Sequence, residues 1–251
     1  MLRQSFIFLQ KISEKKEKNI WGQGIEGWND FLDACKIKGI SKKTKFYYDK
    51  KIKDAKKAFV DCDAEFFANN LPKPEHWRAY SLFKDEAVFL DIETGRRGEI
   101  TVIGMHDGYE TKTMIKGFNL DKKRILCELK KYKMVVTFNG KTFDMPCIEK
   151  YFGLGSSMHP FLHVDLMHAC RKVGLSGGLK QIEKKMGIKR SEKLCHVKGQ
   201  EAAELWRCWL ATGDKYFLKL LVMYNEEDCV NLKMIADIVI EKLWKKTKGL
   251  C

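Results

Sequence analysis

Acidic residues occur at three widely spaced positions in this chain, each in or next to a segment whose apolar residues have the spacing of a strand or a helix. Asp91 and Glu93 come at the end of the short apolar run over residues 86–92, which predicts a buried strand. Side chains two apart in a strand point to the same face, so these two carboxylates are expected side by side. Core packing alone rarely requires such a pair. The pattern therefore predicts a fold in which a central strand delivers carboxylates to a site at its end.

A second acidic position follows another predicted strand. The apolar run KMVVTF ends at Phe138, Asn139 and Gly140 form a turn, and Phe143 and Asp144 are placed to open the next helix. Asp144 is therefore expected at a strand exit, as Asp91 is.

A third acidic position lies in a predicted helix. Apolar residues recur at mostly helical intervals over residues 215–239, and Tyr224 and Asp228 lie four apart within that stretch. Residues four apart share one face of a helix, so the phenol and the carboxylate can reach the same point. The neighbouring Glu226 and Glu227 are expected to be solvated.

Carboxylates held this close repel one another, and burying them without partners costs several kcal/mol. Oxygen ligands favour Mg²⁺ or Mn²⁺, and two such ions roughly 3.5–4 Å apart form the usual clamp for displacement at a phosphodiester. The predicted chemistry is therefore phosphodiester hydrolysis with two ions.

Three motifs together resemble the DEDDy class of 3′ to 5′ exonucleases. DIET at 91–94 is similar to the first exonuclease motif of that class, NGKTFD at 139–144 to the second and YNEED at 224–228 to the third. The class has the ribonuclease H-like fold and includes the proofreading domain of family B DNA polymerases. The resemblance covers roughly residues 85–240, and the chain is similar to small stand-alone prokaryotic members without a polymerase domain.

The resemblance implies a role for each motif residue. Asp91 would bridge both ions, Glu93 and Asp228 would complete the site of the ion that holds the attacking water, and Asp144 would serve the second ion. Tyr224 would orient that water, because a phenol with an ordinary pKa of about 10 is a poor base.

The resemblance also implies contacts to the substrate. Thr94, Asn139 and Phe143 would bind the terminal nucleotide, with Phe143 stacking on its base. His163 and Asp165 are expected nearby, supporting their strand rather than binding metal.

The strand and helix patterns after residue 80 predict an α/β fold, a mixed sheet flanked by helices. Residues 1–80 are predicted to form a small helical basic region and residues 81–251 the ribonuclease H-like exonuclease domain. Within the first region, Ser41 is a candidate N-cap for a helix through Val60. Lysines interleaved with aromatic residues on that helix suit a nucleic-acid track, and a solvated helix docked on the main domain is the alternative.

Residues 1–32 also resemble, in outline, a helix-hairpin-helix DNA-binding element, although the hairpin glycine is missing. Farther along, five basic residues are candidates for holding a phosphate backbone, with solvated surface as the alternative: Lys180, Lys184, Lys185, Lys189 and Arg190.

The charge of the chain favours a polyanionic partner. There are 47 Lys and Arg against 33 Asp and Glu, a formal net charge of +14. Nucleic acid is the expected partner, bound largely through its phosphates. A two-metal site does not by itself distinguish the sugars; single-stranded DNA is favoured over RNA.

The nine cysteines form no Cys-x-x-Cys pair, and no stretch is long enough to cross a membrane. A cytoplasmic protein is therefore expected, without a membrane partner. The favoured activity is metal-dependent 3′ to 5′ exonuclease. The alternatives are a nucleic-acid-binding module without catalysis and a structure-selective endonuclease on the same fold.

Overall fold

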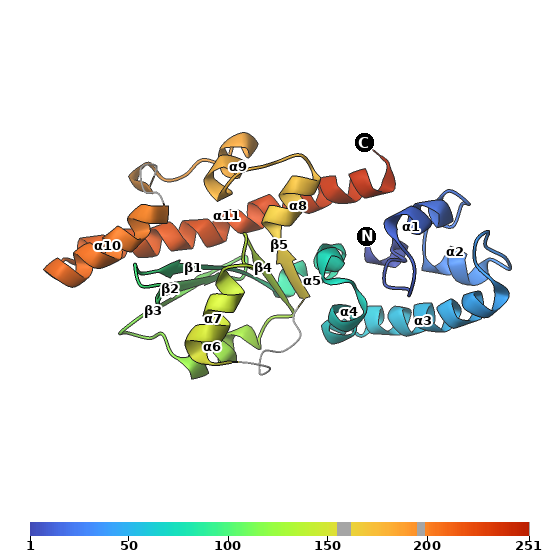
Figure 1. Cartoon of the computed structure of the whole chain (residues 1–251), viewed down its shortest axis with the longest axis horizontal. Coiled ribbons are helices and arrows are strands. Elements are labelled where there is room, and N and C mark those ends of the chain that lie inside the picture. The colour runs from blue at the N-terminus through green and yellow to red at the C-terminus, as the bar shows by residue number, and fades with distance from the viewer. Residues whose placement is uncertain (155–161, 195–198, 251) are drawn as a thin grey trace.

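The computed structural model describes residues 1–154, 162–194 and 199–250. Its centre is a five-stranded sheet in the order β3-β2-β1-β4-β5 (Figure 1). The strands are β1 (Ala87–Thr94), β2 (Ile100–His106), β3 (Thr111–Ile115), β4 (Met134–Thr137) and β5 (Leu162–Asp165).

The sheet is mixed, as predicted. β1 runs antiparallel to β2 and parallel to β4, while β2 and β3 are antiparallel and β4 and β5 parallel. β1 continues two residues beyond the predicted end, through Glu93 and Thr94, where the register against β2 shifts. The acidic pair therefore lies within the central strand, just before a bulge, and not in the loop after it.

The two faces of the sheet carry different helices (Figure 1). Alternate residues Val88, Leu90 and Ile92 of β1 pack in one apolar cluster with α6 (Lys122–Leu129) and α7 (Asp144–Phe152). Ala87 and Phe89 belong to the other cluster, which contains the core face of α11 (Lys215–Lys248). Because side chains alternate along a strand, Asp91 and Glu93 point toward α11.

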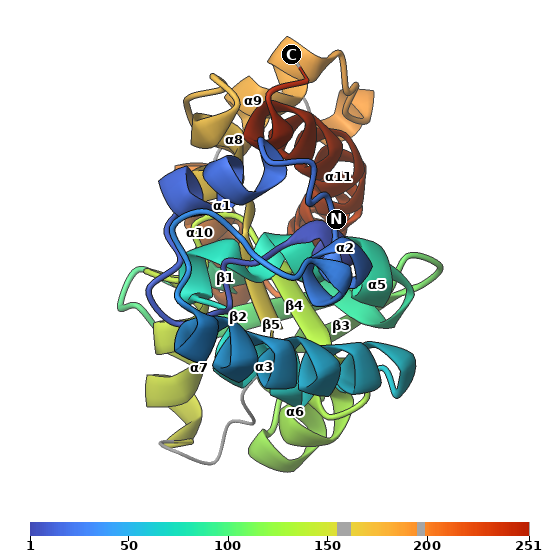
Figure 2. The same ribbon diagram turned by 90° about the vertical axis from the view of Figure 1, so that its right-hand side faces the viewer.

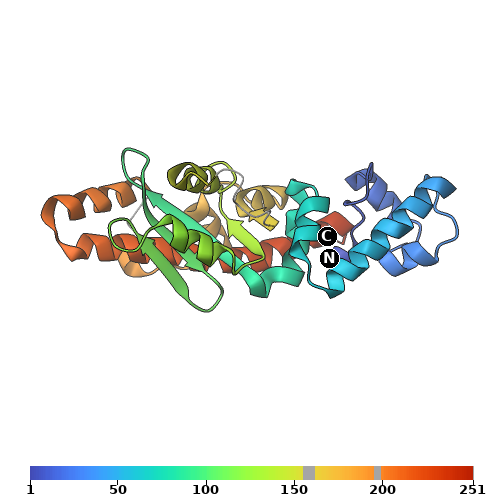
Figure 3. The same ribbon diagram turned by 90° about the horizontal axis from the view of Figure 1, so that it is seen from below.

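α11 is longer than the predicted 215–239 and runs past the whole sheet as far as the N-terminal helices (Figures 1 and 3). α10 (Gly199–Thr212) packs beside its first turns, where the buried Trp206 lies, as expected for a packing residue. The remaining elements of this half are α8 (Leu166–Lys172), α9 (Leu179–Met186) and η5 (Glu192–Leu194).

The first 86 residues are helical, in agreement with the predicted character of residues 1–80. Ser41 caps α3 by accepting a hydrogen bond from the Thr44 N–H, as predicted, and Figure 2 shows this helix in front of the sheet. The elements are η1 (Leu2–Gln4), α1 (Glu14–Trp21), α2 (Trp28–Asp33), α3 (Lys42–Val60), α4 (Ala64–Asn70), η2 (Lys73–Ala79), α5 (Tyr80–Phe83) and η3 (Lys84–Glu86).

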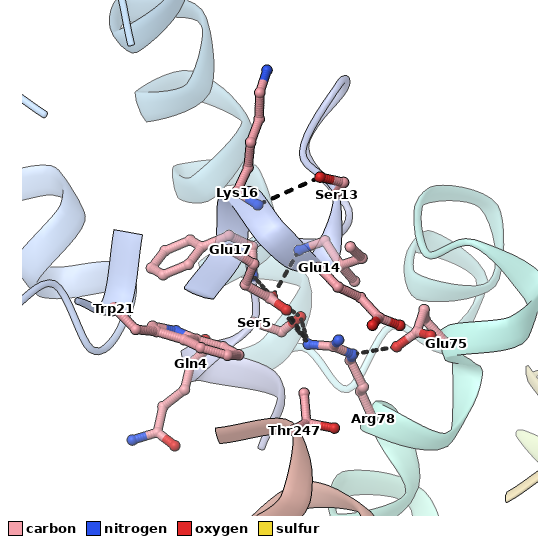
Figure 4. A network of polar contacts seen from close by, with 12 residues as sticks. Gln4, Ser5, Ser13, Glu14, Lys16, Glu17, Trp21, Glu75, Arg78 and Thr247 are labelled. Atoms are coloured by element: carbon pink, nitrogen blue, oxygen red, sulfur yellow. Dashed lines mark hydrogen bonds and ion pairs between the residues drawn. The ribbon is translucent and has the colours of Figure 1, made fainter. Parts of the chain in front are cut away.

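A buried polar network joins these N-terminal helices (Figure 4). The Arg78 guanidinium donates to Glu17 at 2.8 Å and to Glu75 at 2.6 Å, and the Arg78 and Glu17 side chains have no exposed surface. Glu17 also accepts from the Ser5 hydroxyl and from the Phe6 N–H. Burying a charged pair is tolerated here because each carboxylate oxygen of Glu17 has donors.

The N-terminal helices share a core with the sheet. Trp244 near the end of α11 makes ring contacts with Trp21 and Trp77, and one apolar cluster runs from Leu2 through Phe89 to Leu243. Within the described part of the chain, no helix is both long and apolar enough to span a membrane.

Candidate metal centre

Three of the predicted acidic residues meet on the α11 face of the sheet. Asp91 and Glu93 of β1 and Asp228 of α11 each offer a carboxylate oxygen, and these oxygens lie within 4.8 Å of one another. Glu93 and Asp228 are buried and Asp91 is partly buried. Residues from distant parts of the sequence thus form one oxygen-only cluster.

A glycine lets α11 approach the acidic strand this closely. Gly104 of β2 pairs with Asp91, and a Cβ built on it would lie 2.2 Å from the Asn225 amide oxygen and 2.7 Å from the Cys229 sulfur. Asn225 also donates from Nδ2 to the carboxylate and the backbone carbonyl of Asp91, at 2.9 and 3.1 Å. Asn225 therefore holds Asp91 against the helix that supplies Asp228.

Asp144 reaches the same strand from the start of α7. It opens α7, as predicted, and its Oδ1 accepts a hydrogen bond at 3.2 Å from the Ile92 N–H, which lies between the two acidic residues of β1. β4 pairs with β1 only as far as Phe89, so this amide is left for a side chain to satisfy. Asp144 is thus adjacent to Asp91 and Glu93, but it is not one of the three residues whose carboxylate oxygens lie within 4.8 Å of one another.

The turn before Asp144 is held by Asp165. Asp165 is buried and accepts hydrogen bonds from the backbone N–H groups of Asn139, Lys141 and Met167 at 2.9, 3.2 and 3.1 Å. This confirms the prediction that Asp165 supports structure. Asn139 adopts a left-handed φ of 64°, a conformation that asparagine tolerates better than most residues.

The three predicted substrate residues lie near the carboxylate cluster on two parts of the chain, Thr94 at the end of β1 and the other two in the turn before α7. Thr94 lies beyond the bulge of β1, and the Asn139 side chain accepts from the Thr142 hydroxyl at 2.7 Å. Phe143 at the start of α7 is 43% exposed, so its ring is open to solvent beside the buried Asp144.

The electrostatics of the cluster favour a bound cation. Burial, followed by repulsion from Asp228, Glu93 and Asp144, raises the pKa of Asp91 well above its ordinary value. Burial and the charges of Asp228 and Asp144 do the same to the pKa of Glu93.

The remaining two carboxyls are raised less. Burial raises the pKa of Asp144 to about 7, although the amide of Ile92 opposes the shift. Burial likewise raises the pKa of Asp228 to about 6, with Arg190 acting in the opposite direction. Four carboxyls that resist ionising together are a donor set that a hard divalent cation would stabilise.

Tyr224 lies one turn before Asp228 and is buried. Burial raises the pKa of its phenol, and the charges of Asp228 and Glu93 add to the effect. The Lys180 ammonium lies 4.7 Å from the centre of its ring. Tyr224 is therefore a neutral phenol at physiological pH, suited to donating or accepting a hydrogen bond.

Arg190 has a more specific place than the sequence indicated. It was a candidate for a surface phosphate contact, but its guanidinium is buried against Asp228 and forms a two-pronged ion pair with Glu183, at 2.6 and 2.7 Å. Glu183 is buried and also accepts from Asn231 of α11 at 2.9 Å. Glu183 was not anticipated, because nothing in the sequence of α9 distinguishes it from a surface acid.

The expectation for the two glutamates beside Asp228 was wrong. Glu226 accepts from the Thr113 hydroxyl of β3 at 2.8 Å, and Glu227 accepts from the Ser191 N–H at 2.6 Å. Both side chains tie α11 to its neighbours because α11 is covered on more than one side. Lys184, Lys185 and Lys189 are exposed, as a solvated or phosphate-binding surface requires.

The donor set fits divalent metal, since carboxylate oxygens from β1 and α11 converge and the pKa values of all four carboxyls are raised. The family model described as RNase_H superfamily matches residues 88–240. No curated protein matches the chain. Proteins of this superfamily are mostly nucleases that act on nucleic acid with divalent metal ions. The match covers more than half of the chain, from the first residues of β1 into α11, and the sheet is mixed, so the chain belongs to the RNase H superfamily.

Proposed function

We propose that this protein is a metal-dependent 3′ to 5′ exonuclease of the DEDDy type that favours single-stranded DNA. The observation that carries the proposal is the convergence of Asp91, Glu93 and Asp228, with their carboxylate oxygens within 4.8 Å of one another. Asp144 beside β1 and Tyr224 one turn before Asp228 complete the residue set of that class.

Asp91, Glu93 and Asp228 would hold one Mg²⁺ or Mn²⁺ ion, and Asp91 and Asp144 a second. When bound, the ions supply an acidified water and neutralise charge on the phosphodiester. The chain's own contribution is to hold these carboxylates in place, through Asn225 on Asp91 and the Ile92 N–H on Asp144.

Tyr224 would orient the attacking water through its hydroxyl. Its raised pKa supports positioning and argues against proton removal, because a phenol that stays protonated is not a base. Phe143, exposed at the edge of the site, would stack on the terminal base, and Thr94 and Asn139 would contact the same nucleotide.

We further propose that residues 1–80 act as a nucleic-acid-binding region for the domain at 81–251. Phe46 on α3 is 80% exposed, and Lys42, Lys43, Lys50 and Lys53 of the same helix are exposed around it. An exposed ring among ammonium groups matches the chemistry of a single strand, whose bases stack and whose phosphates are anionic.

The test is cleavage of 5′-labelled single-stranded DNA and RNA of one sequence, with Mg²⁺, Mn²⁺ or chelator. The expected result is a metal-dependent ladder that shortens from the 3′ end, faster on DNA. Asp91→Ala should abolish it, and Tyr224→Phe should leave a small residual rate, because the ligands survive but the water is poorly oriented.

A 3′-blocked strand and a circular strand separate exonuclease from endonuclease. An exonuclease leaves both intact, whereas nicking of the circle would replace the proposal with an endonuclease on the same fold. Salt-sensitive binding without any cleavage would instead indicate a binding module. Asp91→Ala that cuts as fast as the parent would show that the carboxylate cluster is not the active site.

A further inference from the structure

A hollow separate from the carboxylate cluster lies between the N-terminal helices and the sheet. It has a volume of about 470 Å³ and is bounded by η2, the end of β5, α8 and the loop before α7. Its apolar wall is formed by Pro74 and Trp77. This volume is within the range of about 300–1,000 Å³ that small-molecule sites occupy.

The other walls are strongly basic. Lys73, Lys141, Arg171 and Lys172 all line the hollow. Lys172 is paired with Glu75 at 2.9 Å. Among the described residues, no carboxylate forms an ion pair with Lys73, Lys141 or Arg171, so three cationic groups share one small space without such a partner.

Among the described residues that line the hollow, Asp165 is the one acidic residue, and its charge acts on Lys141, so it offsets part of the positive charge. Asp165 directs both carboxylate oxygens to backbone N–H groups, including that of Lys141. His163 also lines the hollow, and burial lowers its pKa to about 4, so it is neutral at physiological pH. The hollow therefore combines excess positive charge with an aromatic wall.

The hollow adjoins the candidate metal centre along the chain. Lys141 lies three residues before Asp144, in the turn whose backbone Asp165 holds, and its ammonium reaches the Lys73 carbonyl of η2 at 3.2 Å. The turn at residues 139–143, which Asp165 holds by hydrogen bonds, would thus link a group bound in the hollow to the carboxylate site.

We propose that this hollow binds a phosphate group of the nucleic acid whose end occupies the carboxylate site. Lys73, Lys141 and Arg171 supply the positive charge, and Trp77 and Pro74 form the apolar wall. The inference rests on the proposed exonuclease function and adds to it a second anchoring point, off the metal centre. Two sources share this chemistry: a phosphodiester of the bound strand, and the 5′-phosphate of a released mononucleotide.

Binding in chelator tests the site without relying on catalysis. The anisotropy of a 5′-fluorescein single strand ending in a 3′-hydroxyl would be measured across salt concentrations for the parent, Lys141→Gln, Arg171→Gln and the double variant. Arg171 is exposed and makes no ion pair among the described residues, so its replacement leaves the fold intact. Lys123→Gln, an exposed lysine of α6 on the other face of the sheet, is the matched control.

Each wall variant should weaken binding about tenfold, the effect of losing a hydrogen bond to a charged group. Each single variant should also reduce the salt slope by about one, as for one lost phosphate contact, and the double variant should reduce it by more. Lys123→Gln should change neither quantity. Calorimetry with thymidine 5′-monophosphate tests whether the bound phosphate is that of a released mononucleotide. If the variants weaken binding of this mononucleotide but not of the strand, the hollow holds the phosphate of the product.

Unchanged binding of both ligands in the double variant would overturn the site, whether or not the parent cleaves. Weakened binding in a parent that never cleaves would preserve the phosphate site and remove the exonuclease. The failure of one proposal is therefore distinguishable from the failure of the other.

Discussion

Asp144 and Asp165 are two buried aspartates of the same region that differ in their hydrogen bonds. Asp165 accepts hydrogen bonds from three backbone N–H groups. Asp144 accepts one from Ile92, and its pKa is raised to about 7 by burial. The charge of Asp144 therefore opposes folding when no cation is bound. Both carboxylate oxygens of Asp165, in contrast, accept from the backbone.

This contrast gives a prediction for the metal-free protein. A carboxyl whose pKa is about 7 when folded and about 3.9 when unfolded binds its proton more tightly in the folded state, so stability falls as pH rises toward about 7. Asp144→Asn should therefore unfold several degrees above the parent at about pH 8 in chelator, with the difference shrinking toward about pH 4.

Asp165→Asn is the matched comparison and should lower the melting temperature, because an amide nitrogen in place of one carboxylate oxygen cannot accept a hydrogen bond from a backbone N–H. Thermal unfolding followed by circular dichroism measures both variants. An Asp144→Asn protein less stable than the parent at about pH 8 would mean that its charge is already compensated by the chain.

The carboxylate residues of the site were predictable because each lies at the end of a strand, at the start of a helix after a strand, or on a helix with clear periodicity. Asp91, Glu93 and Asp228 come together as that reasoning requires. Arg190 was anticipated only as a surface cation. It lies after α9, outside any periodic segment, so no pattern could show that it turns inward onto Asp228.

At the scale of elements, the distance between α11 and β2 is set by the missing side chain of Gly104. Gly104→Ala would place a Cβ 2.2 Å from Asn225 and 2.7 Å from Cys229, and both belong to the buried face of α11. Relief of this contact requires either that the Asn225 side chain turns away, which removes its hydrogen bond to Asp91, or that the helix moves away from β1, which separates Asp228 from Asp91.

We therefore expect Gly104→Ala to lose both metal-induced stabilisation and cleavage, with a destabilisation of about 1–3 kcal/mol from overpacking. Gly178→Ala is the control, because no atom lies within 4 Å of the place its new Cβ would take and its φ is ordinary. Urea unfolding with and without Mg²⁺ measures the first effect. Equal Mg²⁺ stabilisation in Gly104→Ala and the parent would contradict this account.

The Glu183–Arg190 pair joins α9 to the segment after it, and each partner also contacts α11, Glu183 through Asn231 and Arg190 through Asp228. Replacing Arg190 by Gln leaves the buried Glu183 without its guanidinium, which costs about 3–5 kcal/mol in comparable buried pairs. Replacing both residues, in Glu183→Gln with Arg190→Gln, should recover much of that loss. A double-mutant cycle in chelator measures the coupling, and additive effects would show that the pair does not act as a unit.

The strands and the main helices were predictable from the spacing of apolar residues and from turn residues. The Ser41 cap of α3 was predictable as well. The length of α11 was not, since its last turns pack against Trp21 and Trp77, which lie far away in sequence. The basic hollow was also beyond prediction, because η2, β5 and α8 contribute its walls separately.

At the scale of the whole molecule, the shared apolar cluster predicts a single unfolding unit. Arg78→Met leaves Glu17 fully buried without its main charged partner and should cost about 3–5 kcal/mol. Tryptophan fluorescence, to which three tryptophans of the N-terminal helices contribute, and circular dichroism should shift together in urea. Lys57→Gln, on the exposed face of α3, should shift neither. Separate transitions for the two probes would show that the regions unfold independently.

α11 also has a mechanical consequence. Trp244, which contacts the N-terminal helices, and Asp228, which contacts the acidic strand, lie 16 residues apart on one uninterrupted helix, about 24 Å along its axis. There is no hinge between them within that helix. The helix is therefore expected to move as one rigid body. A displacement of the N-terminal helices would displace the carboxylate of Asp228 as well.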